Sequence, residues 1–337
     1  MSVPMAITMG DASGVGPEIV LRRHVSHGLG HSVVYGDAAV LRAGAGLLGI
    51  ADIDIVSITE PREWLDGPLC VVDQHRLGAA DLHPGELRAD AGSAARDYVL
   101  AATRDALAGS VAGLVTMPMN KAATQLTDPT FVGHTELIAA ACGVSRYTMM
   151  LAAGDLAVTH VSTHVSLRVA IDRVRADRVL DVIRLTHGAL VGHVPSPRIA
   201  VCGLNPHAGE HGLFGDEDAM YVEPAVVAAV AEGIDASGPH PADTVFHQAV
   251  HRKRFDAIVC MYHDQGHTPM KLLAFESGVN ITVGLPIVRT SVDHGTAFDI
   301  AWQGVAFTES LDHALTWARR LRAGGATASP VSSTTPS

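Results

Sequence analysis

The chain alternates short apolar runs with segments whose apolar residues recur at helical spacing. Met5–Met9, Leu69–Val72 and Ala257–Met261 are typical strand-like runs, because each is too short for a helix and is followed by Gly or polar residues. Ala91–Ala108 and Ala176–Val191 have the helical pattern. Parallel strands need a long crossover between them, usually a helix, so this alternation predicts an α/β fold with a mostly parallel sheet.

One segment departs from the parallel pattern. Tyr147–Leu151 and Leu156–Thr163 are both strand-like, and Ala153-Gly154-Asp155 between them reads as a tight turn. Two strands joined in this way pair as an antiparallel hairpin. We therefore expect mostly parallel sheets with one antiparallel excursion.

The composition favours a small-molecule partner. The net charge is −11, and no run of Lys or Arg is present that would bind nucleic acid or an anionic membrane surface. No apolar run reaches the length of a transmembrane helix. With 337 residues, of which 47% are hydrophobic, the chain has room for one large or two moderate α/β domains.

The N-terminus and the cysteines predict a cytoplasmic protein. The chain opens on a strand-like run, with neither a basic region nor a long apolar segment that would form a signal peptide. The 4 cysteines are far apart and form no C-x-x-C pair, and Cys202 and Cys260 lie inside apolar runs. We interpret them as buried, reduced thiols.

Segment 256–300 places chemically capable side chains after two strand-like runs, Ala257–Met261 and Val279–Leu285. Ligands of α/β proteins collect outside the carboxyl ends of the strands, where side chains and helix N-termini converge. We therefore interpret the segment as the rim of an active site. The polar residues in and after the two runs are His263, Asp264, Lys271, Asn280, Arg289, Asp293 and His294.

A glycine loop, GDASGVGPE, follows the first strand-like run. Gly10, Gly14 and Gly16 precede a helix opened by Pro17, and Asp37 ends the second run, which invites comparison with the Rossmann fingerprint of NAD-binding proteins. The spacing is G-x-x-x-G-x-G, however, the reverse of that fingerprint. Strand–glycine–helix junctions are also common for purely steric reasons, so we do not place a dinucleotide at this loop.

Three histidines, His164, His207 and His263, each follow a strand-like run. Three imidazoles suit Zn²⁺ or a similar divalent ion and leave one position open for a substrate oxygen. Their spacing matches no local metal motif such as H-E-x-x-H, and with 19 histidines in the chain a structural or solvent-exposed role is the alternative.

A second set of residues suits an anion. Phosphate is held by positive charge together with several donors, and the N-terminus of a helix adds backbone N–H groups; Thr135 also reads as a helix cap before Leu137–Cys142. The alternative for Lys271 and Arg289 is a solvated surface cation. The residues of this set are His134, Thr135, Lys271, Asn280 and Arg289.

Seven segments, taken together, resemble the PdxA family, which comprises 4-hydroxythreonine-4-phosphate dehydrogenase and its relatives. In chain order they are GDASGVGPEI, GHTE, STHVSLR, CGLNPHAGE, PADTVF, MYHDQG and GVNITVGLPIVRTSVDHGTAFDIA. The resemblance runs over about residues 5–305.

The resemblance implies a two-domain α/β fold similar to isocitrate and isopropylmalate dehydrogenases, and a homodimer whose active site is shared between subunits. We accordingly expect a discontinuous α/β domain of residues 1–130 and 275–322, which carries the cofactor loop. Residues 131–274 would form a second α/β domain with the metal and dimer-interface elements. Residues 323–337 have too little apolar content to order themselves.

The resemblance also implies roles for individual residues. His164, His207 and His263 correspond to ligands of a divalent metal, with Zn²⁺ expected first and Mg²⁺ or Co²⁺ as alternatives, and His263 is expected from the other subunit. The five residues of the anion set fall on substrate-binding positions. Segment 294–300 resembles the H-G-S-A-P-D-I loop of isopropylmalate dehydrogenases, so the residues expected to bind NAD are His294, Gly295, Thr296, Ala297 and Asp299.

The implied reaction is oxidation of a secondary alcohol, with decarboxylation to follow when the product is a β-keto acid. A bound dication favours loss of the hydroxyl proton, and NAD⁺ takes the hydride. Lys121 and Asp243 are the two candidates for the general base, and Lys121 needs a lowered pKa to serve. Asp264 and Asp293 are better suited to orient histidines.

We expect a 4-phosphorylated hydroxy acid, such as 4-hydroxythreonine 4-phosphate or 4-phospho-D-threonate, because all five residues of the anion set are present; which acid is used stays open. The run HDQGHTPMKLLAF resembles the family branch associated with 4-phospho-D-threonate and 4-phospho-D-erythronate more than it resembles the vitamin B6 enzyme. Another relative in the family oxidises a cis-dihydrodiol dicarboxylate derived from terephthalate. The choice between NAD and NADP is open as well. From other functional classes, a metal-dependent hydrolase would use the histidines without a nicotinamide, and a non-catalytic phosphate or sugar-acid binding protein would need no histidine trio.

Overall fold

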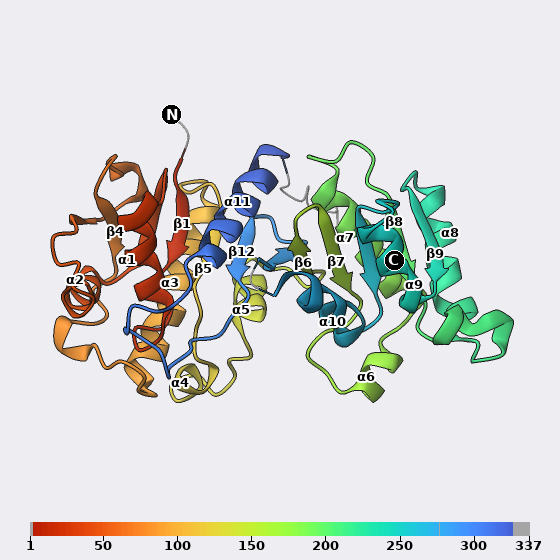
Figure 1. Cartoon of the computed structure of the whole chain (residues 1–337), viewed down its shortest axis with the longest axis horizontal. Helices are drawn as coiled ribbons and strands as arrows, with labels where there is room; N and C mark the ends of the chain where they lie inside the picture. The colour runs from red at the N-terminus through yellow and green to blue at the C-terminus, as the bar shows by residue number, and fades with distance from the viewer. Residues whose placement is uncertain (1–2, 276, 326–337) are drawn as a thin grey trace, which may run out of the picture. The chain divides into compact units, whose positions relative to one another are not determined.

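The computed structural model describes residues 3–275 and 277–325 of the chain. The chain divides into two compact units (Figure 1). Of the described residues, the first unit holds 3–145 together with Pro286–Ala318, and the second holds those of Arg146–Leu285 and residues 319–325. The sequence-based boundaries lay at residues 130 and 275. Of the tail expected at 323–337, residues 326–337 lie outside the described part.

The first unit is built on a parallel sheet with the strand order β3-β4-β2-β1-β5-β12. Most residues of these strands are buried, as expected for a sheet covered on both faces. Its strands are β1 Met5–Thr8, β2 Ser32–Gly36, β3 Ile55–Ile58, β4 Leu69–Asp73, β5 Leu114–Thr116 and β12 Arg289–Val292.

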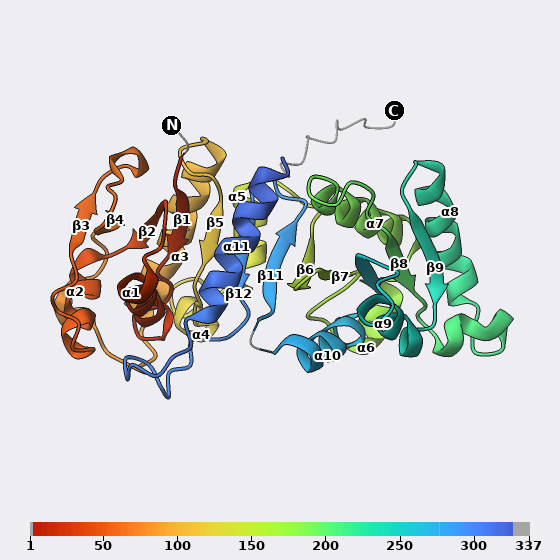
Figure 2. The same cartoon turned by 45° about the horizontal axis from the view of Figure 1, so that its top comes forward.

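Helices cover the sheet of the first unit. Helix α3 contacts β1 and β2, and α11 lies along β12, where Thr290 Oγ1 donates a hydrogen bond to the Ala314 carbonyl at 2.9 Å (Figure 2). The helices are α1 Gly16–His27, α2 Ala38–Leu47, α3 Ala89–Leu107, α4 Lys121–Gln125, α5 His134–Ala141 and α11 Glu309–Ala323, with 3₁₀ turns at Pro61–Glu63 and Ala79–Asp81.

The second unit has a mixed sheet with the order β11-β6-β7-β10-β8-β9. β6 runs antiparallel to both β11 and β7, and the strands from β7 to β9 are parallel. The strands are β6 Thr148–Ala153, β7 Leu156–His160, β8 Ile199–Cys202, β9 Ala236–His240, β10 Ala257–Cys260 and β11 Val279–Val283.

Helices α9 and α10 enclose a hydrophobic core on one face of the second sheet. Val245 of α9 and Met270 of α10 are both buried against residues of β7, β8 and β10. The helices of this unit are α6 Leu167–Asp172, α7 Ala176–Leu190, α8 Glu223–Ala231, α9 Ala242–Val250 and α10 His263–Ala274, with short helical turns at η3 Pro206–Gly212 and η4 Asp218–Val222.

The predicted α/β class, mostly parallel with an antiparallel excursion, is confirmed. The hairpin forms as expected: β6 and β7 pair antiparallel from Met150 opposite Thr159 to Ala153 opposite Leu156. All 4 cysteines are free thiols, as predicted.

Several elements were not predicted from the sequence. β9 has the sequence ASGPH, and α10 contains Pro269, so neither shows the usual pattern of its class. α6 and β12 were also missed. The prediction that Thr135 caps a helix is wrong: α5 begins at His134 with Gly133 as its N-cap, and Thr135 lies inside the first turn.

Within the described residues, no helix combines the length and apolar character that a membrane span requires.

Candidate functional site

The first unit brings a buried arginine close to a histidine at the carboxyl end of β5. Arg289 lies on β12, is 3% exposed, and donates from Nη2 to Thr116 Oγ1 at 2.7 Å. His134 opens α5, and the charges of both Arg289 and Lys121 act on its ring. Three of the predicted site residues therefore belong to one cluster.

Burial changes the pKa values of two residues in this cluster. Burial lowers the pKa of Arg289 to about 10, although the nearby Glu136 carboxylate opposes this shift. The pKa of His134 is lowered to about 3, first by burial and then by the charge of Arg289, so the ring is neutral at neutral pH. A hydrogen bond to the Met117 backbone engages this ring, and its Nε2 atom is buried with no hydrogen-bond partner among the described residues.

A histidine that donates from Nδ1 to a backbone carbonyl has a lone pair on Nε2. In this state, His134 accepts a hydrogen bond at Nε2 and suits a ligand hydroxyl. Arg289, which remains positively charged, suits an anionic group. The cluster can therefore recognise a molecule that carries both groups.

The predicted cofactor loop packs against the glycine loop of the same unit. Val15 N–H donates to the Thr296 carbonyl at 3.0 Å, and Trp302 Nε1 donates to the Ala12 carbonyl at 2.8 Å. A Cβ atom on Gly14 would lie 2.9 Å from the Thr296 oxygen, so glycine is needed for this approach. The sequence treated these two loops as alternatives for the cofactor, but the structure makes them one surface.

Histidine 294 anchors the cofactor loop to the last helix. Its Nε2 atom is 3.0 Å from Ser310 Oγ, and its Nδ1 atom is 3.0 Å from the Gly295 carbonyl. Ala297 has a φ of 42°, and Asp299 is exposed. All five predicted cofactor residues thus lie on an exposed or half-exposed turn.

In the second unit, two of the three predicted metal ligands are neighbours. The ring centroids of His164 and His263 are 5.5 Å apart. A tetrahedral Zn²⁺ about 2.1 Å from each ring nitrogen would hold two imidazole centroids roughly 5 Å apart, so this pair fits one ion. His263 Nδ1 is 2.6 Å from Asp264 Oδ1; when Nδ1 donates this bond, Nε2 keeps its lone pair for a metal.

The third predicted ligand lies on an unusual turn. His207 begins six consecutive residues with positive φ, which end at Gly212; the values range from 45° at Glu210 to 90° at Gly212. The turn is preceded by Leu204 and Asn205, whose backbone N–H groups donate to the buried carboxylate of Asp218 at 2.6 and 3.0 Å. This carboxylate fixes the chain that leads into the His207 turn.

No group of three or more His, Cys, Asp or Glu side chains within residues 3–275 and 277–325 of one chain is arranged to hold a metal. The structure thus brings His164 and His263 together but not His207 with them. That two copies share a complete site stays a prediction.

Two further histidines extend the His263 cluster into the core. His267 stacks on His263 and is hydrogen-bonded to His160, and both His160 and His267 are buried. Burial lowers the pKa of His160 to about 3 and that of His267 to about 4, so both rings are neutral at neutral pH.

The remaining predicted substrate residues of the second unit are Lys271 and Asn280. Lys271 lies two turns after His263 on α10, with Nζ 5.1 Å from the centre of the Phe275 ring. Asn280 lies on β11, and its buried Oδ1 has no hydrogen-bond partner among the described residues. A buried amide oxygen in this state is suited to a ligand donor.

The two candidate bases lie in different units. Lys121 is the first residue of α4 and contributes charge at His134. Asp243 is exposed in the first turn of α9 in the second unit. The geometry of the first unit therefore joins Lys121 to the Arg289 cluster.

Sequence reasoning missed three residues near these clusters. His160 and His267 lie inside a strand and an unpredicted helix, and the only available signal was the four-residue spacing of His263 and His267. Asp11 of the glycine loop is fully buried, and burial raises its pKa to about 6. Its Oδ2 has no hydrogen-bond partner in the described chain.

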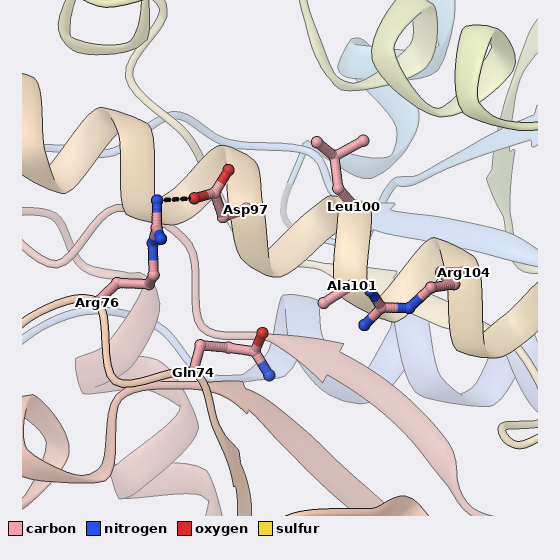
Figure 3. A pocket seen from close by; sticks show the side chains of 6 residues that line it. All are labelled: Gln74, Arg76, Asp97, Leu100, Ala101 and Arg104. Atoms are coloured by element: carbon pink, nitrogen blue, oxygen red, sulfur yellow. Dashed lines mark ion pairs between the residues drawn. The ribbon is translucent and has the colours of Figure 1, made fainter.

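A separate polar cavity of about 330 Å³ lies beside α3 in the first unit (Figure 3). Arg76 forms an ion pair there with Asp97, and Arg104 lines the same space (Figure 3). None of the residues that line it was predicted as a site residue, and the charges of its two arginines are balanced by nearby carboxylates.

Residues 29–318 match the sequence profile of a family described as pyridoxal phosphate biosynthetic protein PdxA. The chain is 45% identical over 327 residues to D-threonate 4-phosphate dehydrogenase of Bordetella bronchiseptica, which covers 95% of this chain and 93% of that protein.

Two solved structures show the same similarity in three dimensions. The 4-hydroxythreonine-4-phosphate dehydrogenase of Klebsiella pneumoniae is 43% identical, with a TM-score of 0.88 and coverage of 95% of this chain and 100% of that chain. A terephthalate 1,2-cis-dihydrodiol dehydrogenase from Burkholderia xenovorans is 30% identical, with a TM-score of 0.68 and coverage of 96% and 99%.

Proposed function

The chain belongs to the PdxA family, and from this premise we propose that it is a metal-assisted dehydrogenase of a 4-phosphorylated hydroxy acid. The relative from Bordetella bronchiseptica is named for D-threonate 4-phosphate, and the one from Klebsiella pneumoniae for 4-hydroxythreonine 4-phosphate. Their identities to this chain, 45% and 43%, are too close to select one of the two substrates.

The observation that carries the proposal is the buried Arg289 beside the unpartnered Nε2 of His134. The arginine supplies positive charge and donors for a phosphate or carboxylate, and the neutral histidine accepts from a hydroxyl. Thr135 adds a side-chain donor in the first turn of α5. A hydroxylated anion is thus the ligand class that this cluster suits.

In the second unit, Lys271 is proposed to bind the anionic end of the substrate and Asn280 to accept from a substrate donor. Lys121 is proposed to take the hydroxyl proton in its neutral amine form, because its side chain is close to the Arg289 cluster; Asp243 is the alternative. The single variants Lys121→Met and Asp243→Asn show which of the two residues is the base, since loss of the base lowers kcat far more than it raises KM.

The histidines are proposed to hold a divalent ion, Zn²⁺ first and Mg²⁺ or Co²⁺ as alternatives. Three neutral imidazoles match the preference of Zn²⁺, and the spacing of His164 and His263 fits one ion. Such an ion, when bound, lowers the pKa of the substrate hydroxyl. Asp264 is proposed to accept the Nδ1 proton of His263, which keeps the Nε2 lone pair of this ring available to the ion.

NAD is proposed to bind at the joined surface of the two loops of the first unit, through His294, Gly295, Thr296, Ala297 and Asp299. When bound, NAD⁺ accepts the hydride, and loss of CO₂ follows if the product is a β-keto acid. The hydrogen bonds that fix this loop, from Val15 to Thr296 and between His294 and Ser310, support a preformed site.

A homodimer is proposed from the exposed apolar end of α10. Leu272, next to Lys271 on the helix that carries His263, is 87% exposed, and Phe275, the C-cap residue of this helix, is 74% exposed. Apolar side chains gathered in this way mark an interaction surface, and a second copy of the chain fits a site that needs a further histidine. Light scattering of Leu272→Glu against wild type tests this assembly.

The function is tested by NADH formation on D-threonate 4-phosphate, D-erythronate 4-phosphate, 4-hydroxythreonine 4-phosphate and a cis-dihydrodiol dicarboxylate, with and without chelator. We expect turnover of a phosphorylated acid that requires NAD⁺ and is lost with the metal. Loss of the acid in reactions without NAD⁺, where no NADH can form, would indicate a metal-dependent hydrolase. Binding of the acids without any turnover would indicate a binding protein.

The cis-dihydrodiol dicarboxylate is the second candidate substrate, because the Burkholderia xenovorans structure covers nearly the whole chain. A carboxylate can use the same cations as a phosphate. Preferred turnover of the dihydrodiol in the same panel would favour this activity.

A further inference from the structure

The ring of His263 lies on a stack that continues into the protein core. His263 and His267 are one helical turn apart on α10, and their ring centroids are 3.8 Å apart with an angle of 8° between the planes. His267 is 8% exposed. One face of the His263 imidazole is therefore covered by a second, almost parallel ring.

His267 is itself held by a fully buried histidine. Its Nδ1 atom is 3.1 Å from Nε2 of His160, which lies at the end of β7 and is 0% exposed. The Nδ1 atom of His160 faces the Met149 carbonyl at 3.5 Å. A carbonyl oxygen only accepts, so His160 is protonated on Nδ1 and accepts at Nε2 the N–H of His267.

The helix is close enough to the sheet for this bond because residue 266 is a glycine. A Cβ atom there would lie 2.5 Å from His160 Nε2 and 2.6 Å from Val158 Cγ1. Any larger residue would push α10 away from β7 and separate the two rings. The close packing of α10 on β7 and the hydrogen bond between His160 and His267 thus depend on each other.

We propose that His267 is a positioning residue for His263: anchored through His160 to β6 and β7, its ring fixes the plane of the His263 imidazole. Asp264 is hydrogen-bonded to Nδ1 of the same imidazole. The hydrogen bond and the stacked ring together restrict rotation of the His263 side chain, so Nε2 points in a single direction. His267 does not share an ion with His263 in this arrangement, because its ring is buried and lies 3.8 Å from the His263 ring and almost parallel to it, so one ion cannot lie in the plane of both rings.

This inference rests on the proposed metal role of His263. A ligand that is already oriented loses less freedom when the metal binds, and partners that orient ligands typically contribute about 10- to 100-fold in metal affinity. An apolar pair would fill the same space but would not present a flat ring. The gain in metal affinity should therefore depend on a flat ring at position 267 and not on how well the core is filled.

The test compares two double variants with equally apolar cores. His160→Leu/His267→Leu removes the stacked ring, and His160→Leu/His267→Phe restores a flat ring without the hydrogen bond. Replacing both histidines avoids leaving a buried, unsatisfied nitrogen, which would cost about 1–3 kcal/mol. His251→Leu is the control, since His251 also lies one turn from a histidine, His247, in a pair that has no part in the proposal.

Metal-free full-length protein is titrated with Co²⁺, and its absorption bands report affinity and geometry. We expect the Leu/Leu variant to bind Co²⁺ tenfold or more weakly, the Leu/Phe variant to recover most of this loss, and His251→Leu to match wild type. Equal affinity of the Leu/Leu variant and wild type would overturn the proposal, as would a Leu/Phe variant no better than Leu/Leu.

Crystal structures of the metal-free variants give a readout that does not depend on metal binding. His263 should have a single ring orientation in wild type and in the Leu/Phe variant, and several in the Leu/Leu variant. A single unchanged orientation in all three would refute the positioning role. Wild-type protein that binds no Co²⁺ would defeat the proposed metal site, and the ring orientations would still decide the role of His267.

Discussion

Replacing Ala208 by glycine should stabilise the second unit. Residues 207–211 have positive φ values, and Ala208, at 54°, is in the left-handed region. In this region, the Cβ of an L-residue crowds the following carbonyl, which costs about 1–2 kcal/mol, whereas glycine has no Cβ. The substitution removes this cost.

The net gain is smaller than the strain, because glycine also loses more conformational freedom on folding. That loss is about 0.5–1 kcal/mol relative to alanine. The methyl group of Ala208 is half-buried against Gly203, so its removal forfeits little burial. We expect the free energy of unfolding to rise by roughly 0.5–1 kcal/mol.

Ala228 provides a matched control with the opposite sign. It lies inside α8, Glu223–Ala231, and is half-buried like Ala208. In a right-handed helix, Ala to Gly lowers the free energy of unfolding by about 1 kcal/mol. The two variants, made by the same chemical change, should therefore differ by roughly 2 kcal/mol.

Urea unfolding of the metal-free protein, followed by far-UV circular dichroism, measures both variants against wild type. The urea midpoint of Ala208→Gly should rise and that of Ala228→Gly should fall. If Ala208→Gly is destabilised as much as Ala228→Gly, the left-handed turn that carries His207 is not the native conformation.

Three further predictions concern the site. His207→Ala should remove bound metal and activity together, and full metal occupancy by elemental analysis would contradict its role as a ligand. Arg289→Ala should mainly raise KM for a phosphorylated substrate, and unchanged steady-state kinetics would reject its proposed grip on the anion. Asp11→Asn should have a higher free energy of unfolding than wild type, and this difference should grow as the pH rises from about 4 to about 6. The reason is that burial raises the pKa of Asp11 to about 6, so the folded wild-type protein binds the proton more tightly than the unfolded chain does. The difference should reach at most roughly 3 kcal/mol above pH 6 and vanish below pH 4, so a gain that is the same at every pH in urea unfolding would refute it.

Local pattern was sufficient to predict the parts of the site that are continuous in sequence. The hairpin β6–β7 and the strand β10 each consist of a short run whose residues decide its own conformation. The same pattern was insufficient for α10, because Pro269 and Gly266 weaken its helical signal while packing against β7 holds it in place.

The sequence by itself determined the α/β class and the candidate residues, because strand and helix periodicity and residue chemistry are local properties. Tertiary structure alone decided which candidates meet. His160 and His267 are 107 residues apart, and they touch only because β7 and β10 are neighbours in the sheet and a glycine lets α10 approach. The glycine loop and the Thr296 loop likewise join only in the folded unit. Such contacts depend on strand order and on close packing between distant segments, and no local pattern specifies either one.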